Sequence, residues 1–151
     1  MNCESPRSRP ASGNSPVPPR EPPADVPSDA HLRLGRRGER RAARYLKRKG
    51  YRILARGYET HAGQIDLICA DGATLVFVEV KTRTSDAHQD PAETVRCVQW
   101  ERIERAARAF LAHPAAVGRP VRFDLVTVLW PTDGRPVIEH HENVHHAAWT
   151  R

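Results

Sequence analysis

The spacing of apolar residues predicts an amphipathic helix early in the chain, over residues 31–49. Ser28 or Asp29 can cap its first turn, and Gly50 ends the pattern. The apolar stripe of this helix consists of Ala42, Ala43 and Leu46. Glu39 lies on the same stripe, four residues before Ala43, so we expect its carboxylate to face the interior.

Five later segments have the apolar patterns that strands adopt. They are residues 51–59, 63–70, 74–83, 121–130 and 136–144. Between the third and the fourth, residues 90–112 predict a second helix, because Asp90 can cap it and Pro91 suits its first turn. The order of helix, three strands, helix and two strands predicts a single α/β domain.

The third strand carries an unusual pair of charges. Its segment LVFVEVKTR, from Leu75 to Arg83, is apolar on both faces at its start. Glu79 and Lys81 are two residues apart, so their side chains project from the same face. A Glu-x-Lys pair on a strand is most often a solvated face, and a catalytic interpretation therefore needs further residues beside it.

The loop between the second and third strands decides which residues are opposed. A two-residue turn at residues 71–72 would set Asp66 opposite Phe77. A four-residue loop would set Asp66 opposite Glu79 instead. Either register places Asp66, Glu79 and Lys81 on one face, whereas a loop of odd length would turn Asp66 away.

Two carboxylates this close on a largely apolar strand pair raise each other's pKa unless a cation lies between them. We therefore expect Asp66 and Glu79 to be metal ligands for Mg²⁺, with Mn²⁺ as a substitute, because Mg²⁺ binds one or two carboxylates plus waters. Lys81 would lie beside a metal-bound water or a substrate phosphate, and Glu39 would complete the acid cluster. Gln99 shares the apolar stripe of the second helix and can reach the same place.

Composition divides the chain into a tail and a domain. Eight of the 13 prolines lie within the first 27 residues, so we expect residues 1–29 to be a disordered tail and residues 30–151 to be one domain. The N-terminal segment has no apolar h-region, so no secretory leader is expected. No apolar run is long enough to span a membrane, so no membrane partner is expected. The three cysteines form no CxxC motif, which favours a reducing, cytoplasmic location.

The net charge of +6 allows a polyanionic partner, and the arginines crowd both predicted helices. For each helix taken alone, a solvated helix face is the preferred explanation of such crowding. Four histidines near the end of the chain could suggest a metal site, but a surface tail is the preferred interpretation. They are His140, His141, His145 and His146. The tryptophans are expected to be packing residues and not base-stacking platforms.

Several motifs together resemble the YraN-like family of small bacterial proteins: Gly38-Glu39, LKRKGYRIL, GQIDLI, VFVEVKTR, RIERAARAFL and RFDLVTV. The family resembles the restriction-endonuclease-like, or PD-(D/E)xK, nuclease fold, which implies a mixed central sheet flanked by helices. The resemblance matches Glu39 to the acid of the first helix and Asp66 to the metal-binding aspartate. It matches Glu79 and Lys81 to the ExK pair, and so implies these four residues as the catalytic set.

The resemblance implies a nucleic-acid-binding, nuclease-like protein, with DNA favoured over RNA. The expected nucleic-acid contacts are Arg36, Arg37, Arg40, Arg41, Arg83 and Gln99. The leading hypothesis is a Mg²⁺-dependent endonuclease that hydrolyses DNA phosphodiesters, branched DNA in particular. Because many nucleases of this fold act as dimers, a homodimer is an open alternative.

Two departures from the family pattern support alternatives. Gln64 stands where the family usually has an acid, and Gln99 where it usually has a lysine. These neutral residues favour a non-catalytic nucleic-acid-binding module with a degenerate active site. A third alternative is a protein-interaction scaffold, in which a contact between Glu39 and Lys81 is purely structural.

Overall fold

The computed structural model describes residues 28–84, 90–96, 98–147 and 149. The predicted tail lies outside these residues except at its boundary, where Ser28 caps a helix that already includes Asp29. The elements in chain order are α1 (Asp29–Arg48), β1 (Arg52–Thr60), β2 (Gly63–Asp71), β3 (Thr74–Thr84), α2 (Pro91–Arg96), α3 (Trp100–Leu111), a 3₁₀ turn (Pro114–Ala116), β4 (Val121–Trp130) and β5 (Val137–His145).

The five strands form one mixed sheet in the order β1-β2-β3-β4-β5. β3 and β4 are parallel, while the other neighbouring pairs are antiparallel. The parallel pair requires a crossover between β3 and β4, and α2 and α3 form it. The predicted α/β class, a mixed sheet flanked by helices, is confirmed, and it is compatible with a restriction-endonuclease-like fold.

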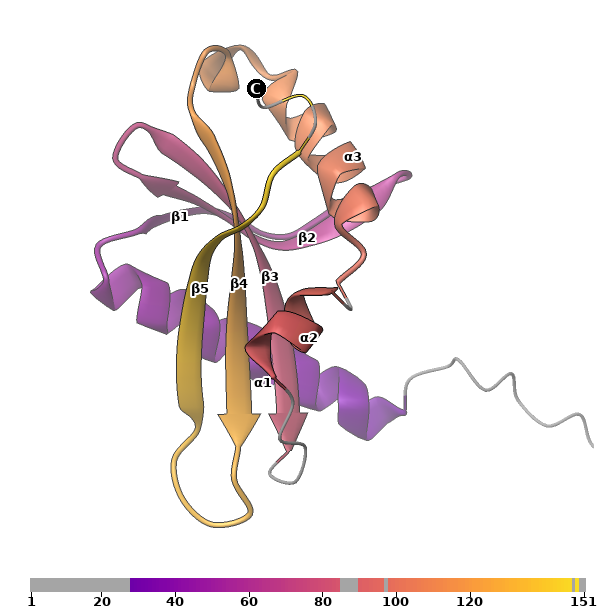
Figure 1. Ribbon diagram of the computed structural model, residues 1–151, viewed down its shortest axis with the longest axis vertical. Coiled ribbons are helices and arrows are strands. Elements are labelled where there is room, and N and C mark those ends of the chain that lie inside the picture. The colour runs from indigo at the N-terminus through magenta and orange to yellow at the C-terminus, as the bar shows by residue number, and fades with distance from the viewer. Residues whose placement is uncertain (1–27, 85–89, 97, 148, 150–151) are drawn as a thin grey trace, which may run out of the picture.

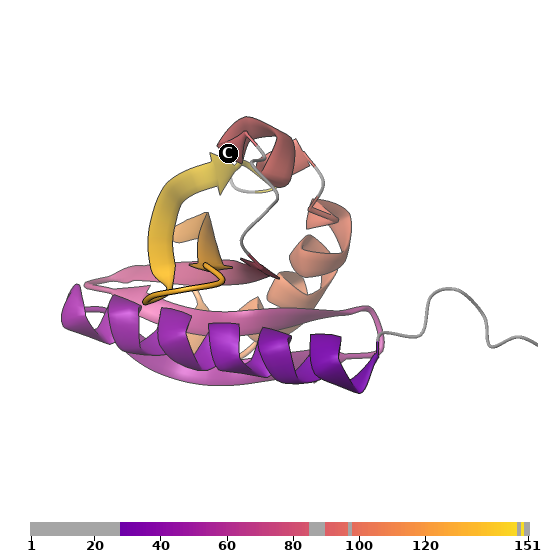
Figure 2. The same ribbon diagram turned by 90° about the horizontal axis from the view of Figure 1, so that it is seen from below.

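Helices cover both faces of the sheet. α1 lies along one face, and α2 and α3 lie on the opposite side (Figures 1 and 2). Two apolar clusters fill the two interfaces. The cluster on the α1 side includes Leu46, Val78 and Val126, and the cluster on the α3 side includes Phe77, Ile103 and Phe123. Residues that alternate along β3 therefore pack into different clusters, as the strand pattern predicts.

The local chemistry of α1 explains where it begins and how closely it packs. The hydroxyl of Ser28 accepts a hydrogen bond from the His31 amide, which caps the first turn. The predicted stripe of Ala42, Ala43 and Leu46 is fully buried. Gly38 lies against Thr82 of β3 so closely that a Cβ atom at residue 38 would overlap the threonine side chain. This close approach brings the residue after Gly38, Glu39, to the sheet.

The prediction of one continuous helix over residues 90–112 is wrong, because the chain forms two helices there. The predicted start is confirmed, since the Asp90 side chain accepts a hydrogen bond from the Ala92 amide. The break lets both Val98 and Trp100 reach the core, where each is at most 9% exposed. The indole N–H of Trp100 donates to the carbonyl of Val95 at 3.0 Å and fastens the two helices together.

The predicted surface tail around the histidines is also wrong. Strand β5 extends to His145, and the side chain of His140 is only 1% exposed. His145 stacks on the ring of Trp100, with ring centres 5.0 Å apart. None of the helices in the described part of the chain combines the length and the apolar character that a membrane span requires.

Candidate functional site

The β2–β3 hairpin sets the register on which the candidate site depends. Asp71 pairs with Thr74, so the turn consists of Gly72 and Ala73, and Gly72 adopts a φ of +57 that favours glycine. The pairing continues to Leu67 opposite Val78. One further step sets Asp66 opposite Glu79. Of the two registers considered from the sequence, the structure therefore adopts the one that opposes the two acids.

The side chain of Asp66 is fixed by the backbone of the facing strand. The Val80 amide donates to Oδ2 of Asp66 at 2.8 Å. Regular alternation along β2 predicts Ile65 on the same face as Leu67, but this is wrong, because Ile65 packs in the α3-side cluster and Leu67 in the α1-side cluster. Gly57 of the neighbouring strand β1 lies opposite Asp66 and has a φ of +56. The alternation of side chains between the two faces of the sheet therefore breaks in β2 beside this aspartate.

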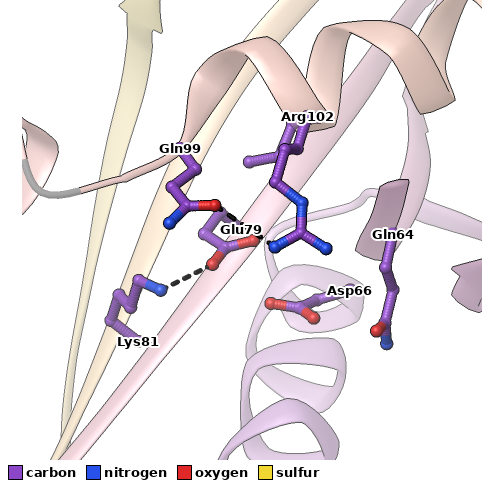
Figure 3. Close-up of a pocket in the computed structure, with 7 residues that line it drawn as sticks. Gln64, Asp66, Glu79, Lys81, Gln99 and Arg102 are labelled. Carbon is purple, nitrogen blue, oxygen red and sulfur yellow. Dashed lines mark hydrogen bonds and ion pairs between the residues drawn. The ribbon is translucent and has the colours of Figure 1, made fainter. Parts of the chain in front are cut away.

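A cleft of about 350 Å³ opens on the α3 side of the hairpin. Its lining residues are Gln64, Asp66, Glu79, Lys81, Gln99, Arg102 and Ile103. Figure 3 shows the two carboxylates, the ammonium and the guanidinium directed toward one another. The prediction that Asp66, Glu79 and Lys81 share one face is thus confirmed by their common place in the cleft.

Lys81 neutralises only one of the two acids. Its Nζ lies 2.8 Å from Oε1 of Glu79, whose side chain is 15% exposed. No ion pair to Asp66 is present within the described residues. The scaffold alternative requires a contact between Glu39 and Lys81. No ion pair joins these two residues in the part of the chain that the structure describes.

The electrostatics of Asp66 reflect this lack of compensation. Burial, followed by the charge of Glu79, raises the pKa of Asp66 to about 8. The amide of Val80 opposes the shift, and the charge of Glu39 adds to it. Without a bound cation the Asp66 carboxyl group therefore holds a proton near neutral pH, where an ordinary aspartate is ionised.

Glu39 approaches the same acids from α1. It is half-buried, and burial raises its pKa, with the guanidinium of Arg36 opposing and the carboxylate of Glu79 adding to the shift. The expectation of an inward acid is confirmed in this sense, although Glu39 is not one of the cleft-lining residues. The charge of Glu79 thus raises the pKa of both Asp66 and Glu39, and the charge of Glu39 also raises that of Asp66.

Arg102 is the site residue that sequence reasoning missed. Its Nη1 donates to Oε1 of Gln99 at 3.2 Å, and its remaining donors point into the cleft (Figure 3). Gly63 of β2 contacts the backbone of Arg102, and a Cβ atom at residue 63 would overlap the Arg102 carbonyl oxygen. Gln99 is exposed at the start of α3 and not on a buried stripe, but it does reach the cleft.

The predicted nucleic-acid contacts fall into different places. Arg36 and Arg40 are close enough to Glu39 to influence its pKa. Arg37 and Arg41 lie over the ring of Trp130, at 4.4 and 5.7 Å from its centre. The remaining arginine, Arg83, is half-buried on β3.

The carboxylate oxygens that line the cleft are of the kind that bind a small divalent cation. Two carboxylates from neighbouring strands offer oxygen ligands only, which is the preference of Mg²⁺ and Mn²⁺, and waters would complete the coordination. Within the described residues, no group of three or more histidine, cysteine, aspartate and glutamate side chains forms a complete metal cage. An ion held by Asp66 and Glu79 would therefore need waters for its remaining ligands.

A second buried carboxylate, Asp124 of β4, is fully compensated. Arg122 donates to both of its oxygens at 2.9 and 3.0 Å, and the Asn143 amide donates at 2.9 Å. Lys49 donates to Nδ1 of His140, so Nε2 of that imidazole carries the proton that it donates to Asp124 at 2.8 Å. Burial alone would raise the pKa of Asp124, but the hydrogen bonds from His140 and Arg122 outweigh it and lower the pKa.

Comparison with known proteins identifies close relatives. The model of the uncharacterised protein family UPF0102 matches residues 38–128, which include Glu39 and the whole acid cleft. A UPF0102 protein of Anaeromyxobacter dehalogenans is 43% identical over 112 residues, covering 74% of this chain and 83% of the relative. One from Symbiobacterium thermophilum is 43% identical over 115 residues, covering 76% and 98%. One from Chlorobaculum tepidum is 47% identical over 96 residues, covering 64% and 74%.

Proposed function

We propose that this chain, which belongs to the uncharacterised protein family UPF0102, is a divalent-metal-dependent endonuclease that hydrolyses DNA phosphodiesters. The observation that supports this function is the cleft in which Asp66 and Glu79 lie on neighbouring strands while Lys81 pairs with Glu79 alone. Ionising both carboxylates costs free energy, because like charges at this range repel each other, and without a cation the Asp66 carboxyl group retains its proton instead. A bound dication would relieve the repulsion.

Asp66 and Glu79 are the ligands of the ion in this proposal. The ion would supply a more acidic bound water and would neutralise charge on the phosphate. The remaining steps fall to side chains of the cleft. Lys81 forms an ion pair with Glu79 at 2.8 Å, which places its ammonium group to donate to the phosphate or to the attacking water.

Arg102 and Gln99 form the wall of the cleft that faces the acids. A guanidinium with free N–H donors binds a phosphate oxygen well, and its hydrogen bond to Gln99 limits its rotation. In hydrolysis the water oxygen bonds to phosphorus as the bond to the leaving oxygen breaks. Arg102 is placed to hold a non-bridging oxygen while this charge rearranges. Arg36 and Arg40 on α1 would hold neighbouring phosphates.

A second candidate function is DNA binding without cleavage. Two observations favour it: the cleft wall contains the neutral amides Gln64 and Gln99, and Lys81 already neutralises Glu79. In that case the cleft would hold a phosphate through Arg102 and Lys81, and the proton on Asp66 would take the place of the ion.

Incubation of the purified protein with supercoiled plasmid and four-way-junction DNA, with and without Mg²⁺ or Mn²⁺, tests the proposal. We expect metal-dependent cleavage that Asp66→Ala abolishes. Glu139→Ala is the matched control, since Glu139 is an exposed acid on β5, and cleavage should persist in it. DNA binding without cleavage, unchanged by Asp66→Ala, would favour the second candidate. Absence of salt-sensitive DNA binding would contradict both.

A further inference from the structure

A line of arginines follows one side of α1, away from the acid that the same helix directs to the sheet. Arg37, Arg41, Arg44 and Arg48 are separated by four, three and four residues, so they lie in a single row along the helix. We call these four residues the arginine stripe. Glu39 is two positions from Arg37, which is roughly 200° around the helix axis. The stripe and the acid cluster therefore use opposite sides of α1.

Two adjoining hollows border the arginine stripe. One, of about 90 Å³, is lined by Arg37, Arg40, Arg41, Arg44 and Trp130. The other, of about 490 Å³, is lined by Arg41, Arg48, Arg135, Pro136 and Ile138. Because Arg41 borders both hollows, the stripe and Arg135 of the β4–β5 loop form one continuous basic surface.

This basic surface has no acidic ion-pair partner in the described part of the chain. Neither the arginine stripe nor Arg135 forms an ion pair with any residue that the structure describes. Like charges one turn apart on a helix destabilise it, and here the row continues for three turns. An external polyanion would remove this repulsion on binding.

The length of the arginine stripe suits a nucleic acid. From Arg37 to Arg48 the helix rises by about 17 Å, which matches the axial rise of about five base pairs of duplex DNA. Each of the four arginines can therefore approach a different phosphate, and Arg135 extends the row beyond the helix.

The surroundings of the stripe disfavour two other polyanionic partners. A helix that binds a membrane surface exposes an apolar face to the lipid, whereas the apolar stripe of α1 is fully buried against the sheet. Single-stranded nucleic acid is usually held by stacking on open aromatic rings. The ring of Trp130 is covered by Arg37 and does not offer such a platform.

We propose that the arginine stripe and Arg135 bind the phosphate backbone of double-stranded DNA, at a surface separate from the acid cleft. Arg44, Arg48 and Arg135 are the new assignments among these residues. The proposal rests on the proposed function only in taking DNA as the polyanion, because it requires neither metal nor cleavage.

Duplex DNA binding measured by fluorescence anisotropy in EDTA, at a series of salt concentrations, tests this surface. The variant is Arg44→Ala/Arg48→Ala/Arg135→Ala. Its matched control is Arg52→Ala/Arg56→Ala/Arg108→Ala, which removes three exposed arginines from β1 and α3. We expect the slope of log affinity against log salt to become shallower by about 2.7 in the variant, which is about 0.9 per lost phosphate contact. The control should keep the wild-type slope.

Equal slopes and affinities in variant and control would overturn the proposal, and so would tighter binding to anionic phospholipid vesicles than to the duplex. Failure of the proposed function has a different signature. A protein that binds duplex DNA through this surface but never cleaves it would support the surface and contradict the nuclease.

Discussion

Two buried carboxylate clusters lie on opposite faces of one sheet, and they differ in how their charge is compensated. Asp124 of β4 receives hydrogen bonds from Arg122, His140 and the Asn143 amide, and its pKa is lowered. Asp66 of β2 receives one from the Val80 amide at 2.8 Å, and its pKa is raised to about 8. Asp124 is fully buried and Asp66 is half-buried, yet the more deeply buried acid is the one whose pKa is lowered, so the hydrogen bonds and not burial distinguish the two.

The difference separates a structural acid from a candidate functional one. Buried charges that serve stability are paired and hydrogen-bonded, as Asp124 is. Acids that serve a reaction are left with unusual pKa values, because their partner is a ligand that comes and goes. Asp66 fits the second description, and this contrast with Asp124 is the basis of the account.

The largest predicted effect concerns stability. Asp124→Asn removes the charge that Arg122 and His140 surround, and should lower the free energy of unfolding by about 3–5 kcal/mol. Asp66→Asn replaces a carboxyl group that must retain a proton near neutral pH with a neutral amide, so it should leave stability unchanged or higher there. Urea unfolding of the two variants against wild type measures both. If the two substitutions were equally destabilising, the distinction between the clusters would be wrong.

The pH dependence of stability should have opposite signs at the two sites. Because the pKa of Asp66 is raised, the folded state binds more protons there than the unfolded state, so stability falls as pH rises from about 4 toward 8. The pKa of Asp124 is lowered, so its contribution is complete above the unfolded value and is lost as the pH falls through the folded one. Unfolding of wild type and Asp66→Asn in EDTA, followed across this range, should show the first slope only in wild type. The same slope in Asp66→Asn would assign it to another group.

The smallest effect concerns the wall of the cleft. Arg102→Ala should reduce metal-dependent cleavage by about tenfold, because it removes one charge-assisted hydrogen bond to the phosphate. Arg108→Ala is the control, since it removes the same charge from the same helix outside the cleft. Initial rates under identical conditions provide the comparison. Equal rates in the two variants would exclude Arg102 from the site.

Much of the hairpin could be predicted from residue order alone. Strand alternation and an even-length connection were enough to bring Asp66, Glu79 and Lys81 to one face. The inward orientation of Glu39 followed from the period of α1. The exception was Ile65, because the positive φ of Gly57 in the neighbouring strand lies outside what an alternating pattern can express.

The features of the fold and the site that the sequence did not reveal depend on tertiary contacts. The gap between α2 and α3 is stabilised by the Trp100 indole, whose partner carbonyl no periodicity reveals. The arginines of the helix that contains Arg102 were expected to face solvent. The close contact between Gly63 and the Arg102 backbone, which brings this arginine to the acids, is a tertiary contact that the sequence pattern does not show. Asp124 was also missed, although a charged residue within the apolar segment RFDLVTV was a usable signal. His140, its partner, is 16 residues later and was expected on the surface.

Calorimetric titration of Mg²⁺ into the protein at neutral pH, in buffers of different ionisation enthalpy, tests the central claim most directly. The account predicts binding of one ion between Asp66 and Glu79 with release of about one proton, because the ion displaces the proton that the raised pKa of Asp66 retains. The heat of Mg²⁺ binding and the proton release should both disappear in Asp66→Asn, and both should persist in Asp124→Glu if that variant folds. Absence of binding to wild type, or binding that Asp66→Asn leaves unchanged, would contradict the account.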